Sequence, residues 1–224
     1  MRVFYLSLLV VIIDQISKLK VKGIKIPFLN LNVEGMTLGS SKQIFGNFFK
    51  ITFIENPGMA FGIELGGKLT LSIFTLFATF LIIYFIYKNS NEGLYLRIAL
   101  AFILGGALGN LIDRIFYGAV FGYAPLFYGK VVDFFHFNIP EFNIFGKAFY
   151  SWPIFNVADI SVTVGFVMIL LGYNKIFKKK SAEFENHSTL EQSDNISEDL
   201  SYVDNENSSS LDSVESKENK ELSS

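Results

Sequence analysis

Residues 69–87 read LTLSIFTLFATFLIIYFIY, an apolar run with no charged residue between Lys68 and Lys88. An α-helix of about 20 such residues is long enough to cross the hydrocarbon core of a bilayer. Half of the 224 residues are hydrophobic and 16% are aromatic, so the run belongs to an unusually apolar chain. The stretch predicts a transmembrane helix, around which the other segments can be placed.

Three further apolar windows lie on either side of it, at residues 3–13, 98–112 and 154–174. The first is too short to span alone, so its helix must carry charged residues into the membrane or to its edge. A cleaved secretory signal is the alternative for this window, but no small-x-small cleavage site follows it. We therefore expect an α-helical membrane protein with four transmembrane helices in a domain of residues 1–180, with spans at about 3–20, 68–88, 96–114 and 153–174.

The net charge of -2 conceals two unlike parts. Residues 1–180 hold 17 Lys and Arg against 9 Asp and Glu, whereas residues 181–224 hold 2 against 12. The acidic part is rich in Ser and Asn and nearly free of aromatic residues, which is typical of disorder. We predict a disordered acidic C-terminal tail, with partner binding as its alternative role. The absence of cysteine excludes a disulfide scaffold, a thiol nucleophile and cysteine-ligated metal sites.

The basic residues beside the expected spans leave the orientation undecided. Seven lie on the side of the two termini and ten on the opposite side. The positive-inside rule gives short loops more weight than the long loop between the first two spans. On that basis both termini are expected in the cytoplasm.

The connecting segments contain signals of a different kind. Residues 49–53 alternate between apolar and polar side chains and lead to Asn56-Pro57-Gly58, which predicts a strand that ends in a turn. Residues 115–153 are aromatic and interrupted by glycine and proline, a composition that suits a membrane interface. The connecting segments are therefore expected to hold a strand and an aromatic stretch at the membrane interface.

Four acidic residues lie inside or beside the spans, where charge is costly and usually functional: Asp14, Asp113, Asp133 and Asp159. Asp14 stands four residues before Lys18, which favours a structural ion pair on one helical face. Asp113 stands beside Arg114 at a helix end, where we expect water to be near. Both are therefore expected to support structure.

Asp133 and Asp159 have no obvious local partner, and adjacent antiparallel spans would bring both to the same membrane face. Two close carboxylates cannot both ionise comfortably, so one keeps a proton and the pair can activate water against an amide. A proton relay or transporter gate would use such a pair equally well. A metal site at His136 is disfavoured, because the only other histidine is His187 in the tail.

Five motifs then occur in a characteristic order: Asp14-Gln15-Ile16-Ser17-Lys18, Asn56-Pro57-Gly58-Met59-Ala60-Phe61, Gly105-Gly106-Ala107-Leu108-Gly109-Asn110-Leu111-Ile112-Asp113-Arg114, Val131-Val132-Asp133-Phe134 and Phe155-Asn156-Val157-Ala158-Asp159. In this order and spacing the chain resembles the prokaryotic lipoprotein signal peptidases, or type II signal peptidases. The glycine run alone would be weak evidence, but five motifs across residues 14–159 are specific.

The resemblance implies a four-helix aspartic endopeptidase of the bacterial inner membrane with a small extracytoplasmic β-element. Such enzymes cleave diacylglyceryl-modified prolipoproteins before the lipidated cysteine; their partners are this substrate and membrane lipid, and the resemblance implies no metal, no other cofactor and no nucleic acid. The motif match puts the catalytic pair at Asp133 and Asp159, the substrate-binding residues at Asn56, Gly58, Asn110, Arg114 and Asn156, and structural support at Asp14, Lys18 and Asp113. The transporter alternative would instead want acids or histidines strung through the membrane depth.

One departure from the family pattern concerns the segment near residues 116–128. Arg114 and Asp133 lie 19 positions apart, farther than the family usually places them. Residues 116–120 and 127–131 resemble each other, as if this stretch had been duplicated. An inert insertion is the favoured interpretation, and an enlarged substrate-facing loop is the alternative.

Overall fold

The computed structural model describes residues 2–26, 30–60, 63–64, 67–90, 93–144 and 147–172, and these fall in one compact unit. Its helices are α1 (Val3–Lys22), α2 (Lys68–Lys88), α3 (Leu94–Ile112) and a last helix, Val157–Gly172. Helix α3 continues through a π-helical turn, η2 (Asp113–Tyr117), into the short α4 (Gly118–Val120). The predicted acidic tail, residues 181–224, lies outside the described residues.

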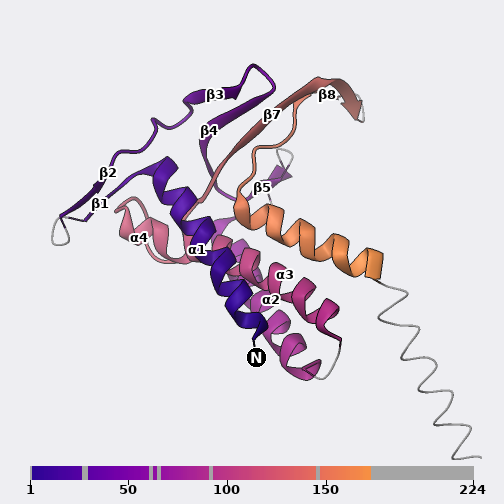
Figure 1. Ribbon diagram of the computed structural model, residues 1–224. Helices are drawn as coiled ribbons and strands as arrows, with labels where there is room; N and C mark the ends of the chain where they lie inside the picture. The colour runs from indigo at the N-terminus through magenta and orange to yellow at the C-terminus, as the bar shows by residue number, and fades with distance from the viewer. Residues whose placement is uncertain are drawn as a thin grey trace, which may run out of the picture. The chain divides into compact units, whose positions relative to one another are not determined.

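Helix α3 packs against both α1 and α2, and Figure 1 shows it among the other helices. Its small residues make these contacts close, as expected for packed membrane helices. A Cβ added at Gly105 would lie 2.7 Å from Cβ of Val10, and one at Gly109 would lie 2.6 Å from Oδ2 of Asp14. The glycine run of the sequence is therefore a packing surface for α1.

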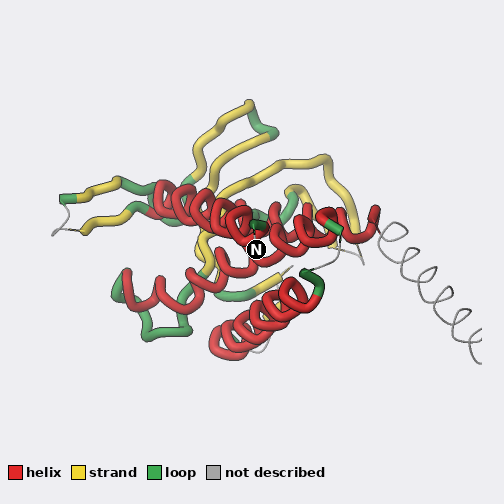
Figure 2. Tube along the Cα trace, turned by 60° about the horizontal axis from the view of Figure 1, so that its bottom comes forward, coloured by secondary structure: helices red, strands yellow, loops and turns green. Residues whose placement is uncertain are grey.

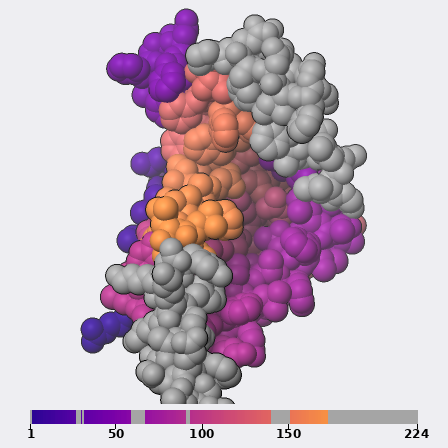
Figure 3. Space-filling view, turned by 90° about the vertical axis from the view of Figure 1, so that its right-hand side faces the viewer, coloured from indigo at the N-terminus to yellow at the C-terminus, as the bar shows by residue number. Residues whose placement is uncertain are grey.

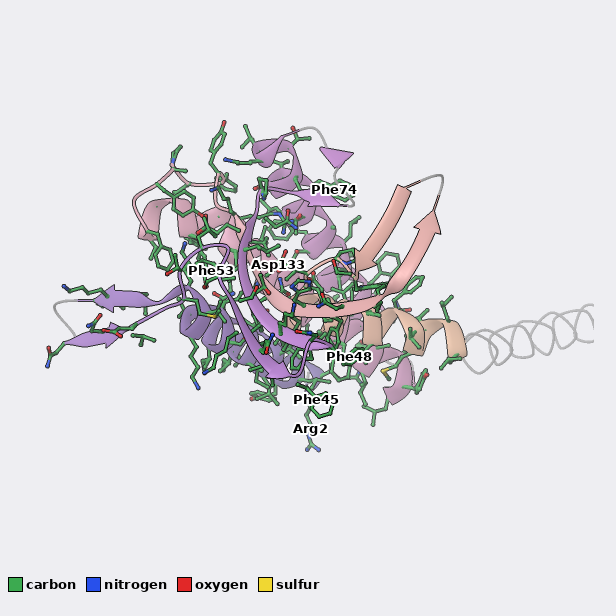
Figure 4. All side chains as sticks on the ribbon, turned by 90° about the horizontal axis from the view of Figure 1, so that it is seen from above. Arg2, Phe45, Phe48, Phe53, Phe74 and Asp133 are labelled. Atoms are coloured by element: carbon green, nitrogen blue, oxygen red, sulfur yellow. The ribbon has the colours of Figure 1, made fainter. Side chains whose placement is uncertain are left out.

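The helices bury polar side chains and expose apolar ones. On α1, Ser7, Asp14 and Lys18 are buried, whereas Leu8, Leu9, Ile12, Ile13 and Ile16 are each about half exposed. Phe74 of α2, labelled in Figure 4, is 66% exposed, and Leu171 of the last helix is 79% exposed. The last helix reaches the surface in Figure 3, where it is drawn in orange. Water would penalise this distribution, whereas lipid hydrocarbon favours it.

Two of the described helices are long and apolar enough to cross a membrane. They are Lys68–Lys88, with a mean hydropathy of 2.3, and Leu94–Val120, with a mean hydropathy of 1.7. The last helix, Val157–Gly172, is apolar but shorter. Helix α1 carries Asp14, Lys18, Lys20 and Lys22, so its apolar character is confined to part of its surface.

The strands gather beyond one end of the helices, as Figures 1 and 2 show. The main sheet is antiparallel in the order β3 (Ser41–Phe45), β4 (Phe49–Asn56), β7 (Val131–Ile144) and β8 (Lys147–Ser151). Two short hairpins accompany it, β1 (Ile24–Ile26) with β2 (Leu31–Val33) and β5 (Met59–Ala60) with β6 (Ile63–Glu64). The strand expected at residues 49–53 is confirmed as part of β4, whereas the long strand β7 exceeds the sequence expectation.

A β-bulge in β4 sets the face on which the strand pair presents its side chains. Ile51 pairs with Phe135, but Ile54 pairs with Asp133, so β4 holds one extra residue between the two pairs. A regular register would place Phe53 opposite Asp133. The bulge instead leaves Phe53 in the hydrophobic core with Val21 and Val132, and Asp133 lies beside Ile54.

Candidate active site

Asp133 lies on β7 where the sheet meets the helices (Figure 4). It is only 2% exposed, and both of its oxygens accept hydrogen bonds from amide side chains. Nδ2 of Asn156 donates to Oδ1 at 2.6 Å, and Nδ2 of Asn56 donates to Oδ2 at 3.1 Å. Burial, together with the charge of Asp159, raises the pKa of Asp133 to about 7 despite these two bonds. A carboxyl group with this pKa can hold a proton at neutral pH.

Asp159 lies in the first turn of the last helix. Asn156 precedes that helix, and its Oδ1 accepts from the backbone N–H of Asp159 at 3.0 Å. Asp159 Oδ2 in turn accepts from the backbone N–H of Asn156 at 3.1 Å, which completes a reciprocal capping box. Asp159 Oδ1 accepts from Nδ2 of Asn110 at 2.9 Å. These two donors and the helix dipole stabilise an ionised carboxylate at this position.

Asn156 joins the two carboxylates. Besides its bond to Asp133, its Nδ2 lies 3.1 Å from Oδ1 of Asn110 and 3.3 Å from the carbonyl oxygen of Val132. It is completely buried, so these bonds form in a medium that penalises any unpaired polar group. Asn156 therefore bonds to both aspartates, and its predicted contact with substrate stays a prediction.

Asp133 and Asp159 line one cavity of about 530 Å³. Its remaining walls are mostly apolar and consist of Ile54, Glu55, Asn56, Pro57, Trp152, Pro153, Ile154 and Phe155. A concave site with apolar walls and a few converging polar groups is the usual form of a ligand site. The cavity can therefore take an apolar peptide segment beside two carboxyl groups.

The other predicted substrate-binding residues lie around this pair. Asn56 lines the cavity, and its Oδ1 accepts from the backbone N–H of Gly58 at 2.8 Å. Gly58 has φ +111°, and a Cβ there would lie 2.5 Å from Cδ2 of Leu71, so only glycine fits this turn. The charge of Arg114 acts on both Asp133 and Asp159. Gly58 thus holds Asn56 in place, and Arg114 supplies a cation to the site.

Lys18 is fully buried and makes three polar contacts. Its Nζ lies 2.8 Å from Oδ2 of Asp14, 2.9 Å from Oδ2 of Asp113 and 2.9 Å from Oδ1 of Asn110. The predicted Asp14–Lys18 ion pair is therefore confirmed. The expectation of water near Asp113 is wrong, because helix α1 and strand β7 cover this helix end and leave Asp113 with no exposed surface.

The same two carboxylates also hold the backbone next to each candidate catalytic residue. Asp14 Oδ1 accepts from the N–H of Ala158 at 2.9 Å, and Asp113 Oδ2 accepts from the N–H of Val132 at 3.1 Å. Ala158 immediately precedes Asp159, and Val132 immediately precedes Asp133. Lys18 therefore connects the two carboxylates, Asp14 and Asp113, that hold the backbone beside Asp159 and Asp133.

Gln15 is a site residue that the sequence reasoning missed. Its Nε2 donates to Oδ1 of Asp113 at 2.9 Å and to the carbonyl oxygen of Gly109 at 3.1 Å. Its Oε1 accepts from the hydroxyl of Tyr117 at 3.0 Å. A polar amide directly after Asp14, at the end of the apolar window of residues 3–13, was the available signal.

His136, the residue weighed as a metal ligand, bonds through Nδ1 to Oγ1 of Thr52 at 2.8 Å. Within the part of the chain that the structure describes, no group of three or more His, Cys, Asp or Glu side chains could hold a metal ion.

Comparison with known proteins agrees with this geometry. The profile of the family described as signal peptidase (SPase) II matches residues 6–175. The lipoprotein signal peptidase of Pelodictyon phaeoclathratiforme is 33% identical over 178 residues, which cover 80% of this chain and 93% of the relative. That of Porphyromonas gingivalis is 35% identical over 195 residues, covering 75% and 80% of the two chains.

A solved bacterial membrane enzyme has the same fold, with a TM-score of 0.57 and 32% sequence identity over 80% of this chain and 91% of that one. The fold and the paired carboxylates thus define a membrane peptidase of the aspartic type. The resemblance seen in the five motifs is confirmed: the chain belongs to the signal peptidase II family. This membership decides against the transporter alternative.

Proposed function

We propose that this protein removes the signal peptides of diacylglyceryl-modified prolipoproteins by cleaving before the lipidated cysteine. The observation that carries the proposal is the buried pair of Asp133 and Asp159, joined through Asn156 at the wall of one cavity. The substrate class follows from the lipoprotein signal peptidases to which the chain is similar.

In the proposed reaction the two carboxyl groups take different parts. We assign Asp159 as the base, because a helix N-terminus and two hydrogen-bond donors face its carboxylate. Asp133 keeps the shared proton, since burial disfavours its ionised form. Asp159 takes a proton from water as the water oxygen attacks the scissile carbonyl carbon. Asp133 donates its proton to the carbonyl oxygen. When the tetrahedral intermediate collapses, Asp159 gives its proton to the departing amine nitrogen, and Asp133 takes a proton back from a hydroxyl group of the intermediate.

Polar side chains at the rim would hold the peptide. Asn56 has an amide at the cavity wall, and Arg114 offers a guanidinium that can bond to peptide carbonyls in a dry site. The apolar walls suit the hydrophobic side chains of a signal peptide. The two acyl chains of the substrate would remain in membrane lipid beside the site.

We propose four transmembrane helices within residues 1–180, with both termini in the cytoplasm and the sheet on the extracytoplasmic side. The apolar outer surfaces of α1 and of the last helix support two crossings in addition to those of α2 and α3. The arrangement places the cavity near the outer membrane surface, where lipidated precursors are exposed. Residues 181–224 form an acidic cytoplasmic tail in this proposal.

A processing assay tests the function. Membranes that contain wild type, Asp133→Asn, Asp159→Asn or the control Glu34→Gln are mixed with a diacylglyceryl-modified prolipoprotein, and the precursor is followed by gel shift. Asparagine preserves the shape of aspartate but cannot exchange the proton, and Glu34 is exposed and outside the cavity lining. We expect cleavage by wild type and Glu34→Gln only. Cleavage by both Asn variants would show that Asp133 and Asp159 are not the catalytic pair. A wild type that does not cleave the precursor would overturn the proposed function.

A further inference from the structure

The reverse face of the strand pair that carries Asp133 is covered by the segment that follows helix α3. Side chains alternate along β4 and β7, so Ile54, Asn56 and Asp133 share one face while Glu55 and Val132 share the other. The cavity lies on the face of Asp133; Glu55 also borders it, but the Glu55 carboxylate is turned to lysines on the other face. On the other face, Phe53, Val132 and Phe134 pack with Val21 of α1 and with Tyr117 of η2, and Phe121 adds to this core.

Glu55 bridges two lysines on this reverse face. Its Oε1 pairs with Nζ of Lys22, the last residue of α1, and its Oε2 lies 3.1 Å from Nζ of Lys130. The side chains of Lys22 and Glu55 are only 10% and 11% exposed, so water screens this pair weakly. Burial pushes the pKa of Glu55 up, yet the bonds to both lysines hold it below its ordinary value. The bridge is therefore charged at neutral pH.

Aromatic residues of the segment enclose this bridge. Nζ of Lys22 lies 4.3 Å from the ring centroid of Phe121 and 5.2 Å from that of Tyr123, within cation–π range. The Tyr123 hydroxyl also accepts from the backbone N–H of Lys130 at 2.9 Å. Phe121 packs edge-on against Tyr117 with 5.1 Å between ring centroids.

The segment is itself fastened at several points. Phe127 has φ +69°, an unfavourable backbone for a non-glycine residue, and its N–H donates to the carbonyl oxygen of Ile115 at 3.0 Å. Its carbonyl oxygen accepts from the buried hydroxyl of Ser72 on α2 at 2.9 Å. Gly129 N–H donates to the carbonyl oxygen of Arg114 at 2.9 Å. The unfavourable backbone conformation of Phe127 persists because these hydrogen bonds hold the segment in place.

We propose that residues 116–130 are a positioning element for the catalytic strand pair, and that Glu55 transmits this positioning to the adjacent Asn56. The proposal rests on the proposed peptidase function. Glu55 ties β4 to α1 and to the segment from behind, which fixes Asn56 at the distance where its amide bonds to Asp133. In this proposal the segment has a structural role, whereas the inert insertion favoured from the sequence stays the alternative that the experiments below would support if the proposal fails.

The test compares Glu55→Gln with wild type and with the exposed control Glu34→Gln in the processing assay. Glutamine keeps the size of the side chain but lacks the charge that holds both lysines. We expect kcat to fall between about tenfold and about a hundredfold, with KM unchanged, as for a displaced catalytic group. Glu34→Gln should retain wild-type kcat.

The pH profile separates positioning from a direct charge effect. The charged groups that act on Asp133 are Asp159 from the last helix, Arg114 from η2 and Lys18 from α1. Loss of the Asn56 bond would move the alkaline limb of activity to higher pH, because that bond favours the ionised Asp133. Loss of the Glu55 charge alone would move it to lower pH. We expect the upward shift, and an unchanged kcat or a downward shift would overturn the role of Glu55.

A second pair of variants tests the segment itself. Tyr123→Leu removes the ring and hydroxyl that contact Lys22 and Lys130. Tyr128→Leu makes the same change at a tyrosine of similar exposure, 39% against 38%, and serves as the matched control. We expect Tyr123→Leu to reproduce the loss of kcat and the upward pH shift, and Tyr128→Leu to match wild type. Wild-type behaviour of Tyr123→Leu would overturn the positioning role, while a wild type that cleaves no prolipoprotein would reject the underlying function instead.

Discussion

Replacement of Lys18 by methionine should destabilise the protein strongly. Methionine fills much of the same volume but removes the ammonium that lies 2.8 Å from Asp14 and 2.9 Å from Asp113. All three side chains have no exposed surface, so the two carboxylates would remain buried without their counter-ion. Breaking a buried ion pair by removing one partner costs about 3 to 5 kcal/mol. For a chain of this size that corresponds to a fall in unfolding midpoint of roughly 6 to 20 °C.

Trp152 provides the assay, because it is the only tryptophan and lines the cavity of Asp133 and Asp159. Its fluorescence can follow thermal unfolding of purified protein in detergent. Lys20→Met is the matched control, since Lys20 is an exposed lysine on the same helix and should change the midpoint little. Activity of Lys18→Met should also fall, because Asp14 and Asp113 hold the backbone beside both aspartates.

A rescue variant tests whether the uncompensated carboxylates cause the loss of stability. Adding Asp14→Asn and Asp113→Asn to Lys18→Met removes the uncompensated negative charge and should restore part of the lost stability. A Lys18→Met protein that unfolds within about 0.5 kcal/mol of wild type would refute the argument, since that is the range of ordinary surface substitutions. A triple variant less stable than Lys18→Met would also contradict it.

Three further outcomes can be measured. Activity should fall as pH rises through about 7, because Asp133 holds its proton below that pH and loses it above. The raised pKa of Asp133 also contributes to the free energy of unfolding; this contribution is complete below the ordinary pKa near 3.8 and is lost as pH rises through about 7, which unfolding measured at several pH values would show. Gly58→Ala should reduce stability by about 1 to 3 kcal/mol and lower kcat, because φ +111° is a strained backbone conformation for any residue with a Cβ; unfolding midpoints and rates measure both. Asn156→Ala should lose about 1 kcal/mol from the helix cap and, in the processing assay, nearly all activity.

Local sequence patterns predicted much of the secondary structure. A helix lies in each apolar window, because a bilayer leaves helices as the simplest way to satisfy every backbone hydrogen bond. The alternation in residues 49–53 predicted part of β4, and the spacing of Asp14 and Lys18 predicted their ion pair. Each of these features depends on residues that are close together in the sequence, so it can be predicted from a single segment of the chain.

The failures involve contacts between distant segments. Asp113 was expected near water because it follows an apolar helix, but α1 and β7 cover that end. The length of β7 depends on pairing with β4 and β8, which its own composition does not reveal. The contacts of residues 116–130 with Lys22, Ser72 and Glu55 were also not predictable from the sequence, and the inert insertion near residues 116–128 stays an untested interpretation.

The sequence by itself determined that this is an apolar, helix-forming chain. It also showed that two acids, Asp133 and Asp159, have no obvious partner nearby in the sequence, and its motifs indicated the peptidase family. The hydrophobicity of a segment and the spacing of residues along a helix are local properties, so the composition and the order of the motifs were sufficient to predict these features. Only the tertiary structure decided that a strand and a helix bring these acids to one cavity, that Asn156 bonds to both, and that a buried Lys18 supports both. Those relations require several segments to converge in space, because each polar group buried there must find its partner on another element.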